Sequence, residues 1–353
     1  MNNKYIYVNN KKIGPGEPTY IIAEISANHN GSLDRAIELV NLCSESGVDA
    51  IKLQTYTADT ITINEDSEIF TIPGEGLWGG KTLYELYSEA YTPWEWHKTI
   101  KDTANSLGLD MFSSAFDKSA VDFLDKINVP AYKIASFEVT DTNLIAYAAT
   151  KNKPLLISTG MANISDIDNA MKAVKGVNDS NQVLLFKCVS SYPAPPEAMN
   201  LRTIPYMSEI FNVPVGLSDH TLGTEISVAA VSLGAVAIEK HVTISRNDEG
   251  PDSKFSMEVD EMKDLVDQIR NVEKGLGNIF FGPTSSEKSN LQFQRSLIVT
   301  QDMSPGEIFT GENLRSIRPG FGLSPIFLDQ IIGLKASKEI VRGTPISWDM
   351  ISG

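Results

Sequence analysis

The stretch TYIIAEISANHNGSLDRAIELVNLCSESGVDAIKLQTY, residues 19–56, decides the fold class. Its two ends, 19–26 and 50–56, are short apolar runs of the kind that forms buried strands. Between them, from Ser32 to Gly47, apolar residues recur every three or four positions, which is the spacing of an amphipathic helix. Because the two runs are apolar throughout instead of alternating, we expect parallel strands that are covered on both faces. The stretch therefore predicts a strand–helix–strand unit.

This pattern continues to about residue 277, and eight strand-like runs alternate with helical segments. Eight such units in about 260 residues are typical of a closed (β/α)8 barrel, or TIM barrel. An open doubly wound sheet is the alternative, but it usually has fewer strands and a glycine-rich first turn, whereas the first turn here is SANHNGS. The predicted strands are 19–26, 50–56, 110–116, 131–136, 154–160, 183–190, 214–220 and 235–242.

Three segments lie outside this repeat. The turn residues Asn9 and Asn10 predict a small hairpin that closes the floor of the barrel. The connection 57–92 is too long for an ordinary loop between a strand and a helix, and we expect it to lie over a functional site. Beyond a polar linker the pattern changes to short strands and turns, which predicts a small second domain. The predicted boundaries are 1–282 for the hairpin and barrel, 283–290 for the linker and 291–353 for the small domain.

The formal net charge of −15 argues against nucleic acid or an anionic membrane as a partner, because an acidic surface repels both polyanions. The N-terminal segment lacks the apolar core of a signal peptide, and no apolar run approaches the ~20 residues that cross a bilayer. We therefore expect a cytoplasmic protein. Cys43 and Cys188 lie far apart in apolar stretches, which favours two buried thiols over a disulfide.

Polar side chains gather at the carboxyl ends of nearly all the predicted strands, which is where the active sites of such barrels lie. A buried lysine is costly unless it is paired, so Lys52 and Lys133 within apolar strands indicate a function. A single serine at such a position can equally be structural. The full set is Glu24, Asn28, Lys52, Gln54, Ser113, Ser114, Lys133, Ser136, Glu138, Ser158, Thr159, Ser190, Ser191, Tyr192, Ser218, Asp219, His220, Glu239, Lys240 and His241.

Two of the four histidines, His220 and His241, end neighbouring predicted strands. Their imidazoles could converge on one divalent ion and leave positions open for water and substrate, as in a catalytic metal site. A histidine at a strand end can also be a hydrogen-bonded scaffold residue, and the matched positions favour the ligand interpretation. His97, in TPWEWHK, is expected on a helix surface without a role.

No phosphate-binding glycine motif stands between a strand and a helix, so nucleotides are not indicated as ligands. Lys52 and Lys133, with the hydroxyls of Ser114, Ser136 and Ser158, could instead hold a small phosphate ester that carries a carboxylate. Neither a nucleophile elbow nor a cysteine–histidine nucleophile pair is apparent, which argues against acyl transfer.

Several segments, in chain order, closely resemble the sialic acid synthase family. They are IIAEISANHNGS (21–32), IKLQTY (51–56), YKIASFE (132–138), STGMA (158–162), GLSDH (216–220), EKHVT (239–243) and GPDSKFSM (250–257). The tail that begins RSLIVTQDMSPGEIF resembles the antifreeze-like (SAF) domain of that family, so the resemblance spans nearly the whole chain. It implies an enzyme that condenses phosphoenolpyruvate with an amino-sugar aldehyde.

Within the family, LWGGKTLYELYSEAYTPWEWH (77–97) and PDSKFS (251–256) resemble the branch that makes pseudaminic acid. The branches that make N-acetylneuraminic and legionaminic acid commonly have G-P-D-H where this chain has Ser253 and Lys254. The resemblance therefore implies 2,4-diacetamido-2,4,6-trideoxy-L-altrose as the sugar. A manno-configured amino sugar is the alternative.

The resemblance also implies roles for individual residues. Glu24 would move a proton at the condensing centre, and His220 and His241 would take part in catalysis by holding a divalent ion: manganese first, with magnesium or cobalt as alternatives. Arg318 would reach the sugar from the partner's small domain, which implies a domain-swapped homodimer. The family often has asparagine where this chain has Ser191. Phosphoenolpyruvate would contact Lys52, Ser114, Lys133, Ser136, Ser158, Ser191 and Ser218, and the sugar would contact Gln54, Glu138, Tyr192, Asp252, Lys254 and Arg318.

Two other functions remain open for this sequence. An aldolase, or a related synthase that uses a phosphorylated sugar, could share the fold, and an aldolase would release no phosphate from phosphoenolpyruvate. A carbohydrate-binding protein with an inactive barrel is the other possibility. The complete set of Glu24, Lys52, Lys133, His220 and His241 argues against it.

Overall fold

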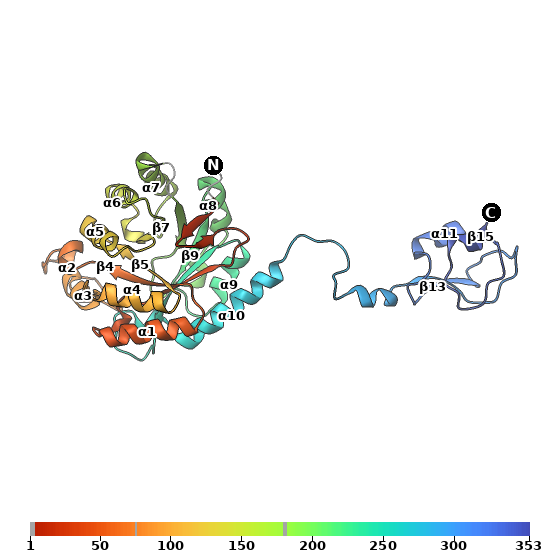
Figure 1. Cartoon of the computed structure of the whole chain (residues 1–353), viewed down its shortest axis with the longest axis horizontal. Helices are drawn as coiled ribbons and strands as arrows, with labels where there is room; N and C mark the ends of the chain where they lie inside the picture. Colours follow the sequence, from red (N-terminus) through yellow and green to blue (C-terminus); the bar gives the residue numbers. More distant parts are fainter. Residues whose placement is uncertain (1–3, 75, 179–181) are drawn as a thin grey trace. The chain divides into compact units, whose positions relative to one another are not determined.

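In the computed structural model, eight parallel strands are hydrogen-bonded in chain order, and pairing of the eighth with both the seventh and the first closes a barrel (Figure 1). The structure describes residues 4–74, 76–178 and 182–353, so the first three residues of the predicted barrel domain lie outside it. The predicted (β/α)8 fold is confirmed. The strands are β3 (Tyr20–Glu24), β4 (Ala50–Thr55), β5 (Asp110–Ala115), β6 (Tyr132–Ile134), β7 (Leu155–Ser158), β8 (Val183–Cys188), β9 (Val215–Asp219) and β10 (Ala237–Thr243).

Helices surround the barrel and cover its outer face (Figure 1). The first of them begins after Ser32, whose side chain accepts a hydrogen bond from the backbone N–H of Arg35, and it buries Leu39, Val40 and Cys43. Cys43 and Cys188 are both free and buried, as the sequence predicts. The helices are α1 (Leu33–Glu45), α4 (Trp96–Ser106), α5 (Lys118–Lys126), α6 (Thr142–Ala149), α7 (Ile164–Val177), α8 (Thr203–Phe211), α9 (Glu225–Ser232) and α10 (Val259–Leu276).

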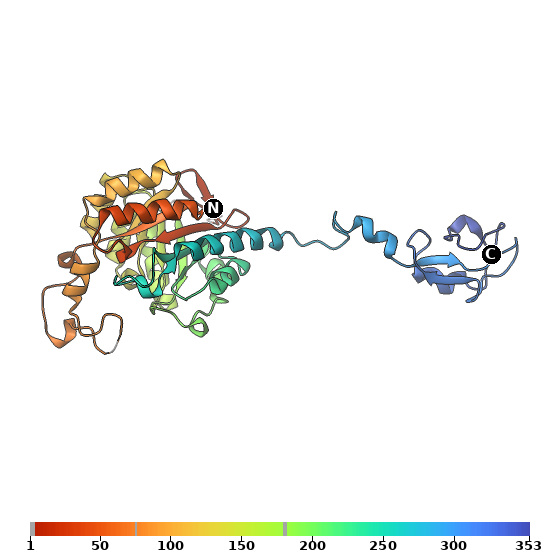
Figure 2. The same ribbon diagram turned by 90° about the horizontal axis from the view of Figure 1, so that it is seen from below.

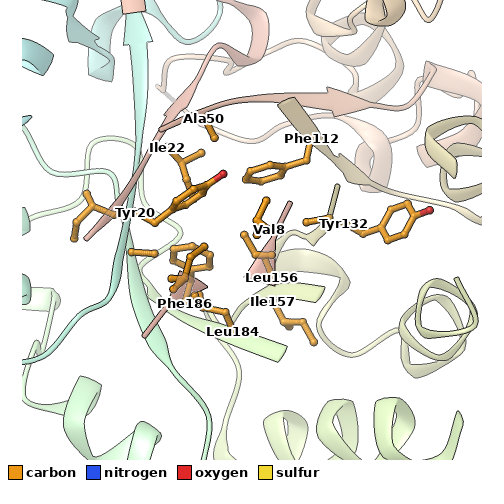
Figure 3. Close-up of a cluster of buried hydrophobic side chains, with 14 of the residues drawn as sticks. Val8, Tyr20, Ile22, Ala50, Phe112, Tyr132, Leu156, Ile157, Leu184 and Phe186 are labelled. Carbon is orange, nitrogen blue, oxygen red and sulfur yellow. The ribbon is translucent and has the colours of Figure 1, made fainter. Parts of the chain in front are cut away.

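The interior of the barrel is filled by apolar side chains at its floor. Figure 3 shows Ile22, Phe112, Leu156 and Phe186 gathered there, and all four are fully buried. Strands β1 (Ile6–Val8) and β2 (Lys11–Ile13) form the predicted antiparallel hairpin, which brings the buried Val8 to the same cluster. Apolar side chains and the hairpin therefore close the floor of the barrel.

The long connection after β4 is an excursion of the chain, residues 57–95, that carries helices α2 (Ala58–Ile61) and α3 (Leu83–Ala90). In Figure 2 this orange segment extends beyond the barrel. The indole N–H of Trp94 donates to the backbone oxygen of Tyr56, with N and O 3.1 Å apart. This bond joins the two ends of the excursion.

The prediction that His97 lies on a helix surface is wrong. His97 stands near the start of α4 and is fully buried. Its Nε2 accepts from the hydroxyl of Thr55 at 2.7 Å, so its Nδ1–H donates to the backbone oxygen of Pro93 at 3.2 Å. Burial lowers the pKa of His97 to about 4, which keeps the ring neutral. The burial of His97 could not be predicted from the polar residues around it in the sequence. It follows from the packing of α4, which turns the histidine toward strand β4.

The chain divides into two compact units after Gly277, slightly before the predicted end of the barrel domain at 282. The second unit contains strands β12 (Ser296–Val299), β13 (Leu314–Ile317), β14 (Lys335–Ala336) and β15 (Ile351–Ser352), paired as two antiparallel hairpins. A small apolar core that includes Leu297, Phe309 and Ile340 stabilises it. Across the described residues, no helix combines the length and the apolar character that a membrane span requires.

Candidate active site

A cluster of four buried charges lies inside the barrel, on strands β3, β4, β6 and β10. Both carboxylate oxygens of Glu239 accept from the ammonium group of Lys133 at 2.8 Å. The Nζ atom of Lys52 lies 3.4 Å from Glu239 Oε1 and also forms an ion pair with Glu24. Each side chain is at most 4% exposed, so the charges can exist there only because they compensate one another.

The local electrostatics set the protonation of this cluster. Burial raises the pKa of Glu24, although Lys52 opposes the shift. Burial acts in the same direction on Glu239, but Lys133 and Lys52 outweigh it and lower the pKa of Glu239 to about 2. Burial also lowers the pKa of Lys133, which has one carboxylate partner and the positive Lys52 nearby. Glu239 is therefore a fixed anion, whereas Glu24 is the carboxylate that can change its protonation.

Serine hydroxyls surround the charges. Ser114 accepts from Lys52 at 3.3 Å, and Ser218 donates to Glu239 at 3.1 Å. Ser136 accepts from the backbone N–H of Gly160 at 3.1 Å. The Oγ atoms of Ser158 and Ser190 are buried and lack a hydrogen-bond partner among the described residues. Buried polar atoms without partners are rare, and they mark positions where a ligand can bind.

The shape of the backbone keeps this space open. A Cβ atom at Gly160 would lie 2.7 Å from the hydroxyl oxygen of Ser136 and would collide with that of Ser190. Any residue other than glycine at position 160 would fill part of the space beside the serine hydroxyls. We call this space, with Lys52, Lys133 and the serines around it, the cradle. Two ammonium groups and several hydroxyl donors match a phosphate ester.

His220 and His241 come together at the mouth of the barrel, with ring centroids 5.3 Å apart. The Nδ1–H of His220 donates to the backbone oxygen of Val189 at 2.9 Å, which leaves its Nε2 lone pair available. His241 Nδ1 is buried without a hydrogen-bond partner in the described part of the chain, and it lies 4.0 Å from Asp252. Burial, together with the nearby His220, holds the pKa of His241 well below its usual range, so this ring is a neutral ligand.

These two imidazoles fit a weakly held divalent ion. In the described residues, no group of three or more histidine, cysteine, aspartate or glutamate side chains is placed to bind a metal. Two protein ligands would leave the remaining coordination positions of such an ion open for water and substrate oxygens, as in a catalytic metal site.

A second ion pair lies behind the histidines, on the outer side of the same strands. The Nζ atom of Lys240 lies 2.9 Å from Asp219 Oδ2 and donates to the backbone oxygen of Thr221 at 2.6 Å. Ser227, on α9, donates to the same carboxylate oxygen. Because side chains alternate along a strand, these outward residues lock β9 to β10 next to the inward-facing His220 and His241.

Two acids beside this mouth hold protons near neutral pH. Burial raises the pKa of Glu138 to about 7, and one of its oxygens lacks a partner among the described residues. Burial likewise raises the pKa of Asp252 to about 7. Tyr192 packs against the histidine pair, with its ring centroid 4.5 Å from that of His220. Such groups can donate hydrogen bonds to a sugar hydroxyl as well as accept them.

The model of the NeuB family matches residues 39–280 of the chain, more than half of its length. The chain belongs to the NeuB family. The SAF domain model matches residues 294–352, which assigns the second unit. The resemblance seen in the sequence is therefore confirmed.

Individual NeuB family relatives extend over almost all of the chain. The pseudaminic acid synthase of Campylobacter jejuni (strain 81-176) is 46% identical over 325 residues, 92% of this chain and 94% of the relative. The pseudaminic acid synthase of Helicobacter pylori is 42% identical over 337 residues, 95% and 98% of the two chains. The crystal structure of the spore coat polysaccharide biosynthesis protein SpsE from Bacillus subtilis has a TM-score of 0.67 at 33% identity and covers 99% of each chain.

Two of the residues that the NeuB resemblance pointed to, Ser191 and Lys254, are not brought to this cluster. Ser191 is exposed and donates to the backbone oxygen of Pro193, because the inward positions along β8 and its extension are 186, 188 and 190. Lys254 is exposed. Arg318 is exposed on the SAF unit, the second of the two compact units of the chain. Among the other predicted strand-end residues, Asp219 and Lys240 face outward, whereas Glu24, Lys52, Ser114, Lys133, Ser218, His220 and His241 make the contacts given above.

Two residues of the site, Glu239 and Ser190, were named only as polar strand ends without a role, and a third, Cys188, was expected to be structural. Glu239 was noted only as a polar strand end, although it is the anion that both lysines share. Ser190, and not Ser191, has its hydroxyl near Ser136 and Gly160. Cys188 Sγ lies 3.9 Å from His220 Nδ1, so a cysteine does approach a histidine here. Alternation along β8 was the signal that could have found Ser190 and Cys188 together.

Proposed function

We propose that this chain is a pseudaminic acid synthase. It would condense phosphoenolpyruvate with 2,4-diacetamido-2,4,6-trideoxy-L-altrose and water to give pseudaminic acid and phosphate. The observation that most directly supports this proposal is the buried cluster of Lys52, Lys133, Glu24 and Glu239 beside the pair of His220 and His241. The identity of 42% and 46% to two pseudaminic acid synthases over nearly whole chains favours this branch over those that use manno-configured amino sugars.

Phosphoenolpyruvate would bind in the cradle of lysines and serines. The unpartnered hydroxyls of Ser158 and Ser190 would donate to its phosphate or carboxylate oxygens, and Lys52 and Lys133 would offset its charge. Tight positioning of this kind contributes to catalysis because the reacting carbons are held together before the reaction begins.

The reaction forms one carbon–carbon bond and breaks one carbon–oxygen bond. C3 of phosphoenolpyruvate attacks the aldehyde carbon of the sugar, and the aldehyde oxygen takes up a proton to become a hydroxyl. Water adds to the cationic C2, and Glu24 can accept the proton that this water loses, since its pKa is raised by burial. The resulting tetrahedral carbon expels phosphate and leaves the 2-keto acid. Lys52 and Lys133 stabilise the charge of the departing phosphate.

A divalent ion, for which manganese is our first candidate, would be held by His220 and His241 and would polarise the aldehyde oxygen as a Lewis acid. We expect exhaustive treatment with a chelator to abolish phosphate release, and added manganese to restore it. A His241→Gln variant should stay inactive under the same restoration, because it lacks one of the two ligands. Phosphate release at the original rate after complete metal removal would contradict the role of the ion.

Arg318 lies in the SAF unit, and we propose that it acts on the sugar bound to the other subunit of a domain-swapped homodimer. An Arg318→Ala protein and a Glu24→Gln protein should each be nearly inactive. Mixed subunits should regain up to about a quarter of wild-type activity, as expected when one of two sites in a statistical half of the dimers is intact. Phosphate release that stays at the sum of the two separate variants after exchange would count against a swapped arrangement.

Product identification tests the proposed function directly. Purified protein is given phosphoenolpyruvate with the altrose derivative, with N-acetylmannosamine, or with the 2,4-diacetamido manno analogue, and the products are identified by mass and NMR. We expect phosphate and pseudaminic acid with the first sugar. Preferred conversion of either manno sugar would assign the chain to another branch, and a condensation product without phosphate release would indicate an aldolase.

A further inference from the structure

A continuous row of aromatic rings runs outward from the histidine pair to Trp78 on the excursion 57–95. The ring centroid of Tyr192 lies 4.5 Å from that of His220 and 5.7 Å from that of Trp78. Tyr192 follows β8 and His220 follows β9, whereas Trp78 belongs to a segment inserted after β4. Residues distant in the chain thus form one apolar surface beside the mouth of the barrel.

Phe255 completes this surface. Its ring centroid lies 5.0 Å from that of His241, 5.1 Å from that of Tyr192 and 6.4 Å from that of Trp78, whose ring is perpendicular to it. Phe255 is buried, while Trp78 and Tyr192 are only partly buried. We call Trp78, Tyr192 and Phe255 the ring wall. Its partly buried members are the ones that can exchange contact with water for contact with a ligand.

Trp78 is held in this position by a specific bond. Its indole N–H donates to the backbone oxygen of Pro251 at 3.0 Å. Pro251 precedes Asp252, whose carboxylate is hydrogen-bonded to Ser26 at the end of β3. The excursion is therefore attached to the mouth of the barrel through Trp78. This hydrogen bond positions the indole ring of Trp78.

The chemistry of the wall indicates what it can distinguish. A methyl group placed against aromatic rings gains contact, whereas a hydroxyl group in the same place loses hydrogen bonds to water without replacement. If the aldehyde carbon of the sugar lies at the histidine pair, then C6 is the far end of the six-carbon chain. A 6-deoxy sugar presents a methyl group at that end.

We propose that Trp78 is a specificity-determining residue whose ring, with Tyr192 and Phe255, contacts the C6 methyl group of a 6-deoxy amino sugar. This rests on the proposed function and adds to it the residue that selects the deoxy sugar. Tyr192 stands next to the reacting end, so Trp78 is the member of the wall that can be changed without altering the histidine pair.

The test compares two sugars that differ only at C6: 2,4-diacetamido-2,4,6-trideoxy-L-altrose and its 6-hydroxy analogue. We measure kcat/KM for both, and KM for phosphoenolpyruvate, in the wild type and in Trp78→Ala, Trp78→Phe and Ile69→Ala. Ile69 is the matched control, because it is an apolar residue of the same excursion that is 82% exposed. A single methyl contact is typically worth about ten-fold or more in specificity.

We expect Trp78→Ala to lower the preference for the deoxy sugar about ten-fold and to leave KM for phosphoenolpyruvate unchanged. Trp78→Phe should keep most of the preference, since it retains a ring but loses the N–H bond to Pro251. Ile69→Ala should behave as wild type. An equal loss for both sugars in Trp78→Ala, or a loss of preference in Trp78→Phe as large as in Trp78→Ala, would overturn the proposal.

Two further outcomes keep the proposal separate from the function on which it rests. If Trp78→Ala does not fold, as judged by thermal unfolding, Trp78→Gln replaces it and the same loss of preference is required, because glutamine offers no apolar surface to the methyl group. If the wild type releases phosphate with neither altrose sugar but does so with a manno sugar, the proposed function fails. If the wild type prefers the deoxy sugar and removal of the ring leaves that preference unchanged, only the role of Trp78 fails.

Discussion

A Glu24→Gln protein should release phosphate at least about a hundred-fold more slowly than the wild type, while it still binds phosphoenolpyruvate. Glutamine has nearly the same shape but cannot accept the proton that the attacking water loses, and general-base catalysis is typically worth ~10²–10⁴ in rate. The substitution also removes one of the two carboxylate partners of Lys52, so affinity for the anionic substrate should be retained or increased. Stopped phosphate assays give kcat, and calorimetric titration gives the dissociation constant.

Glu45→Gln is the control for Glu24→Gln, because Glu45 is exposed at the end of α1 and its loss should leave kcat unchanged. A Glu24→Gln protein with more than a tenth of wild-type kcat would exclude Glu24 as the essential base. Loss of phosphoenolpyruvate binding together with activity would mean that Glu24 organises the cradle instead.

The second large effect concerns stability. Replacement of Glu239 by glutamine should lower the free energy of unfolding by about 3 kcal/mol, because removal of one partner leaves a buried charge uncompensated. Lys133 has no other carboxylate partner within salt-bridge distance among the described residues, and it is almost completely buried. Denaturant unfolding followed by circular dichroism measures the difference.

The pH dependence of this difference has a definite sign. The pKa of Glu239 is lowered from 4.5 to about 2 in the folded protein, so its stabilisation is present above pH 4.5 and is lost as the pH falls toward 2. The gap between wild type and Glu239→Gln should therefore close in acid. Asp102→Asn is the control, since the ion pair of Asp102 with Lys98 is exposed, and it should change stability little. Equal stability of Glu239→Gln and wild type at pH 7 would mean that Lys133 is neutral in the resting protein.

Much of the fold could be predicted because the strand signal is local. All eight predicted strands overlap the observed ones, although several end earlier than expected. Ser136, for instance, lies in a short 3-10 turn after β6 and not in the strand. The end of a strand depends on where its hydrogen-bonded neighbour ends. The sequence of one segment does not contain that information.

The site was predictable to the extent that its residues stand at strand ends. Lys52, Lys133, His220 and His241 were recognised as a group because the carboxyl ends of parallel strands meet at one face. Which charges pair could not be predicted, because Glu239 is joined to Lys133 by a contact across the barrel. The burial of His97 and the inward turn of Trp78 likewise depend on how the excursion 57–95 packs, for which the sequence carries no periodic signal.

The buried cluster contains as many carboxylates as ammonium groups before any substrate enters. The positive charge of the two lysines is therefore already neutralised. An incoming anion must compete with Glu24 and Glu239, which are held beside the lysines at high local concentration. Chloride or another singly charged anion should therefore bind weakly, because it cannot replace both carboxylates. A multiply charged anion that contacts both lysines and the serine hydroxyls at once can displace those carboxylates, so we expect the site to select such anions over common monovalent ones.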